Sequence, residues 1–179
     1  THFTDEALAG VAFGEVRDVH FEGADGETVQ MFVVLPPGHD GTSPRPLVHV
    51  IHGGPHGISA DAFHFRWNGQ LFAAPGYVAA LVNFQRSTSW GQDFAQRIQG
   101  AWGERPYRDV MAATDVLIEC GLADPDRMAA AGGSYGGYMT SWIASRTDRF
   151  RCVVNHAGVY DLLAQYACDV TEARAASFG

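Results

Sequence analysis

Residues 127–138 read RMAAAGGSYGGY, and this stretch decides the fold. Its alanine-rich first half predicts a strand at 127–131, in a crowded part of a sheet where only small side chains fit. Its second half has the pattern G-x-S-x-G around Ser134 and leads into a helical pattern. Glycines beside the serine allow a sharp, strained turn in which a Cβ on a neighbouring residue would clash. The stretch therefore predicts an exposed, nucleophilic Ser134 beside a helix N-terminus.

Strand and helix patterns alternate on both sides of this stretch. In chain order we expect strands at 16–21 and 28–35 joined by a turn at Asp25 and Gly26, a strand at 47–51, a helix at 63–74, a strand at 77–82, helices at 92–98 and 106–120, the strand at 127–131, a helix after Gly137 and a strand at 152–155. Strand–helix–strand order is typical of a mostly parallel sheet with helices on both faces. With the serine turn, it predicts an α/β protein of the α/β-hydrolase fold.

Composition excludes several function classes. The 179 residues carry 12 basic and 20 acidic side chains, a net charge of −8, without a basic cluster. This argues against nucleic acid and membranes as partners. Every basic residue is arginine, so a P-loop lysine, a Schiff-base lysine and a Ser–Lys dyad are all absent. The alternative interpretation of the segment around Ser134 is a glycine-rich turn that merely packs tightly or binds a phosphate. The sequence has no G-x-G-x-x-G motif to support a phosphate site.

The cysteines and histidines do not predict a metal site or a cofactor. Cys120, Cys152 and Cys168 are an odd number without close spacing, and we expect packing residues in a reduced, cytoplasmic protein. A zinc pair from His52 and His56 would lie on a loop without a supporting cluster of ligands. No apolar run approaches the roughly 18 residues that span a membrane.

An attacking serine creates an oxyanion, which two backbone N–H groups must stabilise. One donor should be the N–H of Tyr135, the residue after the nucleophile. The other should come from the loop after the strand at 47–51, which reads His52-Gly53-Gly54-Pro55. An ordinary Gly-Pro turn is the alternative interpretation of that loop.

Further sequence signals lie in the segments His52-Gly53-Gly54-Pro55, Asn83 through Ser87-Thr88 to Gly91-Gln92-Asp93-Phe94, Trp102-Gly103, Asp109-Val110 and Gly132-Gly133-Ser134-Tyr135-Gly136-Gly137-Tyr138. Together these segments resemble the catalytic domain of prolyl-oligopeptidase-like serine peptidases, above all the acylaminoacyl-peptidase and dipeptidyl-peptidase branch. The resemblance spans residues 16–161 and implies that Ser134 is the nucleophile, with the N–H groups of Gly54 and Tyr135 as the oxyanion hole. After Asn83 the family usually has Pro-Arg-Gly, whereas this chain has Phe84-Gln85-Arg86. Ser89 and Trp90 replace a usual Gly-Tyr pair.

The rest of a catalytic triad is not evident. The expected chain order is serine, acid, histidine. Only His156 follows Ser134, at the end of the next predicted strand, and we expect it to be a structural residue there. Asp161 is expected to be a loop residue, with the triad acid as its alternative role. The chain also lacks an initiating Met.

The resemblance implies that residues 1–179 are a fragment, with the acid and histidine beyond Gly179 and a β-propeller before Thr1. Residues 1–15 would then be a linker or the end of that propeller domain, and residues 16–179 part of the catalytic domain. The expected function of the parent protein is hydrolysis of short peptides through an acyl-enzyme on Ser134. A carboxylesterase or lipase of the same fold, or a non-catalytic binding protein, is the alternative. The sequence leaves open whether the protein forms an oligomer.

Overall fold

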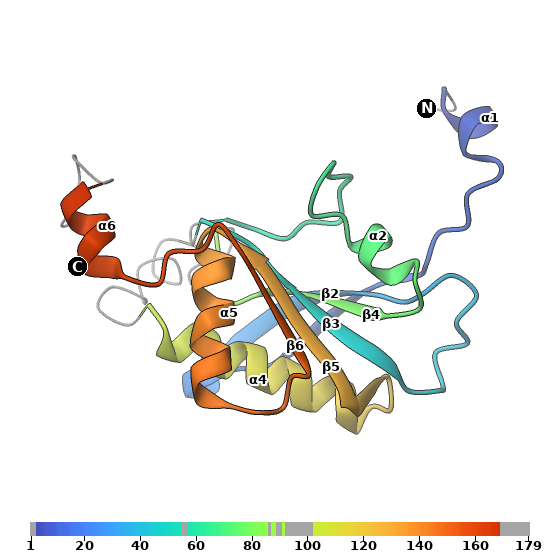
Figure 1. The fold of residues 1–179 in the computed structure, drawn as a ribbon. Coiled ribbons are helices and arrows are strands. Elements are labelled where there is room, and N and C mark those ends of the chain that lie inside the picture. The colour runs from blue at the N-terminus through green and yellow to red at the C-terminus, as the bar shows by residue number, and fades with distance from the viewer. Residues whose placement is uncertain (1–2, 55–56, 86, 89–90, 92–101, 169–179) are drawn as a thin grey trace.

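The computed structural model describes residues 3–54, 57–85, 87–88, 91 and 102–168, which form a twisted sheet with helices against both faces (Figure 1). The elements are α1 (Asp5–Leu8), β1 (Val16–Glu22), the 3-10 turn η1 (Ala24–Gly26), β2 (Thr28–Val34), β3 (Arg45–Ile51), α2 (Gly69–Ala73), β4 (Val78–Asn83), α4 (Glu104–Glu119), β5 (Ala123–Gly133), α5 (Tyr135–Arg146), β6 (Cys152–His156) and α6 (Leu162–Cys168).

The strands lie in the order β1-β2-β4-β3-β5-β6. β1 and β2 form the predicted antiparallel hairpin, β2 is antiparallel to β4, and β4, β3, β5 and β6 are parallel to one another. This mostly parallel sheet confirms the predicted fold class. Ile51 at the end of β3 is paired with Gly132 near the end of β5. The loop after β3 and the turn after β5 therefore leave the sheet side by side.

Apolar side chains form a core on each face of the sheet. On one face α4 and α5 cover a large core that includes Met31, Leu47, Leu117, Ala130 and Met139. On the other face α2 covers a smaller core that includes Val34, Val50, Ala73, Ala79 and Ala131. Because successive side chains of a strand point to opposite faces, the alanines of β5 serve both cores. Their small volume lets both layers approach this central strand, as its sequence predicts.

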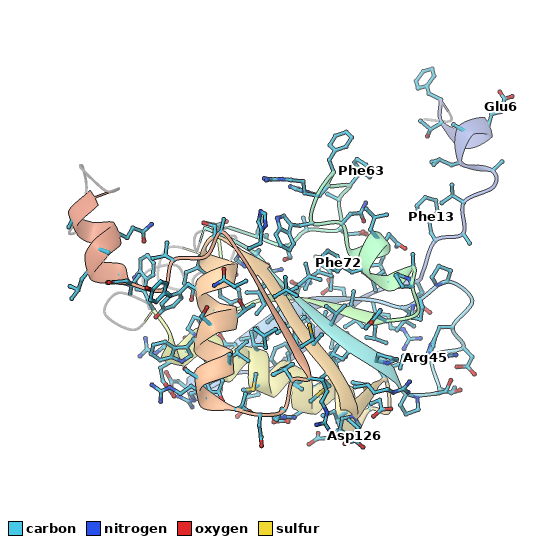
Figure 2. All side chains as sticks on the ribbon, in the orientation of Figure 1. Glu6, Phe13, Arg45, Phe63, Phe72 and Asp126 are labelled. Carbon is cyan, nitrogen blue, oxygen red and sulfur yellow. The ribbon has the colours of Figure 1, made fainter. Side chains whose placement is uncertain are left out.

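The helix predicted at 63–74 is wrong in its first half, because α2 covers only Gly69–Ala73. The Nδ1 atom of His64 accepts hydrogen bonds from the backbone N–H groups of Arg66 and Trp67, which makes a turn instead. The Asn68 side chain then caps α2 by accepting from the Gln70 N–H at 3.0 Å. Phe63 is 73% exposed and points away from the sheet (Figure 2). Phe63 therefore does not belong to the buried face of a helix.

Cys120 and Cys152 are free, exposed thiols rather than packing residues, because one follows the last turn of α4 and the other begins the outermost strand β6. The predicted helix at 92–98 lies outside the described residues. Among the helices that the structure describes, none is long and apolar enough to cross a membrane.

His49, on the central strand β3, is a fully buried polar residue. Its Nε2 atom lies 2.8 Å from the Thr114 hydroxyl, which itself donates to the Val110 carbonyl. The hydroxyl has only one proton, so it must accept from an Nε2–H of a neutral imidazole. Burial, together with the positive charge of Arg149, lowers the pKa of His49 to about 3. The folded protein therefore keeps this ring neutral.

Stability should fall in mild acid for this reason. Below pH about 6.5 the unfolded chain takes up a proton at His49 that the folded chain refuses until pH about 3, so the free energy of unfolding decreases with falling pH. We expect His49→Leu to reduce this loss by up to about 1.4 kcal/mol per pH unit between pH 6 and 4. Urea unfolding at pH 7 and pH 5 measures it, with the exposed His20→Leu as control. Equal losses in the native protein and His49→Leu would contradict this account of the core.

Candidate active site

Ser134 occupies the turn between β5 and α5. Its backbone has φ 56° and ψ −120°, a conformation that costs an L-residue energy and is concentrated at functional sites. Its N–H donates to the His156 carbonyl at 3.0 Å, and its carbonyl accepts from the Tyr138 N–H in the first turn of α5. The residue is exposed. Strand β5, the turn and helix α5 thus place an exposed Ser134 beside a helix N-terminus, as the sequence predicts.

The flanking glycines are required by backbone contacts. A Cβ on Gly136 would overlap the carbonyl oxygen of Ile51, and one on Gly132 would overlap the backbone of Gly136. Strand β3 and the start of α5 therefore touch main chain to main chain. This close approach fixes α5 against the sheet directly below the serine.

The loop after β3 lies against the same turn. A Cβ placed on Gly53 would be 3.1 Å from the Gly133 carbonyl oxygen and 3.4 Å from the Ser134 Cβ. Gly54 follows it in an exposed position with φ 127°, which favours glycine. Tyr135 is the first residue of α5, at the end of the helix where N–H groups point outward and favour an anion. The structure thus brings all three predicted site residues, Ser134, Gly54 and Tyr135, to one edge of the sheet.

His52 is held through both ring nitrogens. Its Nδ1 lies 2.9 Å from the Gly53 carbonyl oxygen and its Nε2 lies 2.8 Å from the hydroxyl of the buried Ser87. The ring also stacks on Phe84, with the ring centres 4.3 Å apart. Burial lowers the pKa of His52 to about 4, so the ring is neutral near pH 7. With both nitrogens engaged, His52 is not placed to accept the proton of Ser134.

A buried carboxylate supports the loop that holds His52. Asp109 on α4 accepts hydrogen bonds from the Gln85 N–H and the Ala24 N–H, each at 2.7 Å. The Gln85 amide in turn donates to the Ala24 carbonyl at 2.9 Å. Burial raises the pKa of Asp109 to about 6, against the effect of these donors. Asp109 lies in one of the segments that carry the family resemblance, but the sequence alone does not predict this supporting role.

An aromatic residue that the sequence does not single out also lies at the site. A Cβ on Gly133 would meet the Trp67 ring at 2.6 Å, and the His156 ring lies edge-on to Trp67 with centres 6.0 Å apart. A cavity of about 200 Å³ opens beside Trp67, between the loop before α2 and the sheet, and His52 and Phe63 help to line it. No local pattern in the sequence places Trp67 beside Gly133, which is 66 positions further along the chain.

The described residues do not complete a triad. The exposed His156 contributes its carbonyl to the turn, and Asp161 caps α6 by accepting from the Ala164 N–H at 3.0 Å. Within the described parts of the chain, no side chain hydrogen-bonds the Ser134 hydroxyl, and no cluster of three or more potential metal ligands occurs. The structural roles predicted for His156 and Asp161 agree with these contacts. Pro55 and His56 lie outside the described residues.

Comparisons with known proteins cover most of the chain. The sequence model of the prolyl oligopeptidase family matches residues 63–178. A probable dipeptidyl-peptidase 5 of Emericella nidulans is 35% identical over 162 residues, which are 89% of this chain and 22% of that protein. The acylaminoacyl peptidase structure of Pyrococcus horikoshii superposes with a TM-score of 0.82 at 27% identity, covering 93% of this chain and 27% of that one.

A puromycin-hydrolyzing peptidase of Mycobacterium tuberculosis superposes with a TM-score of 0.80 at 29% identity, covering 88% of this chain and 24% of that one. The chain therefore spans about a quarter of the length of the proteins that it matches.

Proposed function

This chain belongs to the prolyl oligopeptidase family, and we propose that its protein is a serine peptidase that hydrolyses short peptides through an acyl-enzyme on Ser134. The observation that carries the proposal is the strained, exposed turn of Ser134, with the backbone of Gly53, the residue before Gly54, packed against it. The peptidases among its relatives support amide bonds as the target.

In the proposed reaction, the Ser134 Oγ attacks the carbonyl carbon of the scissile amide while a general base takes its proton. The N–H groups of Gly54 and Tyr135 donate hydrogen bonds to the oxyanion of the tetrahedral intermediate. The C–N bond then breaks, and the protonated base returns the proton to the leaving amine. The base then takes a proton from a water molecule, whose oxygen attacks the acyl ester. The ester C–O bond breaks, the base returns the proton to the Ser134 Oγ, and the carboxylic acid product is released.

We propose that the base and its carboxylate partner are a histidine and an acid beyond Gly179. Two observations support this. His52 already uses both ring nitrogens, and His156 uses its carbonyl to hold the turn and packs its ring on Trp67. The chain also spans only 22% of its relative from Emericella nidulans, which leaves much of such a protein outside residues 1–179.

Substrate comparison distinguishes the peptidase from an esterase of the same fold. We expect the full-length protein to release 4-nitroaniline from aminoacyl or dipeptidyl 4-nitroanilides, because the oxyanion hole and base serve amide cleavage. Short-chain 4-nitrophenyl esters are the comparison, since esterases and peptidases both cleave them. Turnover of esters without any cleavage of the anilides would favour the carboxylesterase alternative. Binding without turnover of either substrate would favour a non-catalytic protein.

A further inference from the structure

Trp67 lies against the turn that carries Ser134. A Cβ on Gly133 would meet its ring at 2.6 Å, and the ring of His156, whose carbonyl accepts from the Ser134 N–H, lies edge-on to it. The Trp67 ring also stacks on Phe72 of α2, with the ring planes 6° apart and the centres at 6.1 Å. Trp67 is only partly buried. Packing therefore holds the ring in place, while part of it stays accessible next to the nucleophile.

The cavity of about 200 Å³ beside Trp67 has an apolar floor. The floor consists of Val34, Val50 and Leu81, three buried residues of the neighbouring strands β2, β3 and β4. An engineered cavity of about 150 Å³ with an apolar lining binds benzene, so this cavity has room for one phenylalanine or leucine side chain. It is smaller than the roughly 300 to 1,000 Å³ of pockets that bury a drug-sized ligand.

Most of the polar side chains that line the cavity already bind the protein itself. Asn68 caps α2, and the Gln70 side chain accepts from the Gly14 N–H and donates to the Gly14 carbonyl. The His64 Nδ1 accepts from two backbone N–H groups of the loop before α2, and Asp61 is exposed. A polar group of a substrate would lose its hydration over the apolar floor. The cavity therefore favours an apolar side chain.

We propose that Trp67 and this cavity form a subsite for one apolar side chain of the peptide, at a residue next to the bond that Ser134 cleaves. The inference rests on the proposed function and adds the class of peptide that is preferred, namely one with an aromatic or branched aliphatic residue beside that bond. Trp67 supplies the wall nearest the nucleophile. Phe63, at the outer end of the loop before α2, supplies a wall near solvent (Figure 2).

The expected preference is large enough to measure. In a hydrophobic pocket a single methylene typically changes kcat/KM by 10-fold or more. We expect the full-length protein to prefer a phenylalanine or leucine in this subsite over an alanine by at least about 30-fold in kcat/KM.

Two series of substrates, each with Phe, Leu or Ala at position X, show on which side of the bond the residue lies. In Gly-X-4-nitroanilides X belongs to the acyl part. In Gly-Ala-X-Ala peptides, cleaved between Ala and X as confirmed by mass spectrometry, X belongs to the leaving part. We expect Trp67→Ala to reduce the preference for Phe over Ala at least about tenfold in one series and less than about twofold in the other. Trp67→Phe keeps an aromatic wall and should retain at least about a third of the native preference.

Ile58→Trp tests the cavity itself. Ile58 is an exposed residue that lines the cavity, so a larger side chain there should narrow the cavity without disturbing the core. We expect the series that responds to Trp67→Ala to lose at least about fivefold of its preference for Phe. Leu71→Ala is the control, because Leu71 is an exposed apolar residue of α2 outside the cavity lining, and its preferences should stay within about twofold of the native ones.

The ratio of two kcat/KM values does not depend on the fraction of folded enzyme, so it separates selectivity from lost protein. If Trp67→Ala lowers the rates for the Phe and Ala substrates by the same factor in both series, Trp67 only supports the turn, and the inference is overturned. A native protein without a preference for Phe or Leu in either series overturns it as well. Both results leave the proposed function intact. A native protein that cleaves neither the anilides nor the peptides contradicts the proposed function itself, and this inference with it.

Discussion

Replacement of Ser134 by alanine in the full-length protein is expected to lower kcat for peptide anilides by at least about 10⁴-fold and to abolish reaction with fluorophosphonates. Without the Oγ no acyl-enzyme forms, and what remains is the contribution of substrate binding and the oxyanion hole. Alanine keeps the Cβ, so the strained backbone at φ 56° is unchanged and the fold should persist. Rates at saturating substrate, with circular dichroism to confirm folding, measure the effect.

Ser145 provides the matched control for this variant. It lies on α5, the helix that follows Ser134, and its exposed hydroxyl donates only to the Trp142 carbonyl of the same helix. Ser145→Ala should keep the native rate within about twofold, as expected for a surface change away from any special feature. A Ser134→Ala protein that retains a substantial part of the native rate would show that another residue is the nucleophile.

A second large effect is expected at Gly136, on stability rather than on chemistry. The added Cβ of Gly136→Ala would overlap the Ile51 carbonyl oxygen and lie 3.2 Å from that of His52. Both contacts are with backbone, and β3 is fixed between β4 and β5, so neither partner can yield easily. We expect the free energy of unfolding to fall by about 3 kcal/mol, at the upper end of the usual cost of overpacking. Urea unfolding followed by circular dichroism measures this.

Gly10→Ala is the corresponding control, because a Cβ at Gly10 has no atom within 4 Å. Its free energy of unfolding should stay within about 0.5 kcal/mol of the native value. If Gly136→Ala were as stable as Gly10→Ala, the close contact between β3 and α5 would be disproved, and with it the explanation of why a glycine stands two residues after Ser134.

The local features of the site were predictable because their geometry is encoded in a few consecutive residues. The turn at Ser134 follows from the glycines around it, and the hairpin of β1 and β2 follows from two extended runs around Asp25 and Gly26. The strand order was not predictable in the same way. The pairing of Ile51 with Gly132 joins residues far apart in the sequence, and no local pattern specifies it.

The same difference between local patterns and contacts of distant residues explains which features could not be predicted from the sequence. Trp67 lies within the helix that the sequence predicts at 63–74, but the side chain of His64 and the cap from Asn68 favour a turn before α2. The support of His52 by Ser87, and of the Gln85 loop by Asp109, joins residues 35 and 24 positions apart. Polar contacts of this kind depend on the tertiary structure, so the composition of the individual segments does not reveal them.

The site of covalent modification tests the central claim most directly. After reaction of the full-length protein with a fluorophosphonate and digestion with trypsin, cleavage after Arg127 and Arg146 releases residues 128–146, which contain Ser134, Ser141 and Ser145. We predict that fragment-ion mass spectrometry places the adduct on Ser134 alone. An adduct on either of the other two serines, or elsewhere in the protein with Ser134 unmodified, would contradict the assignment of Ser134 as the nucleophile.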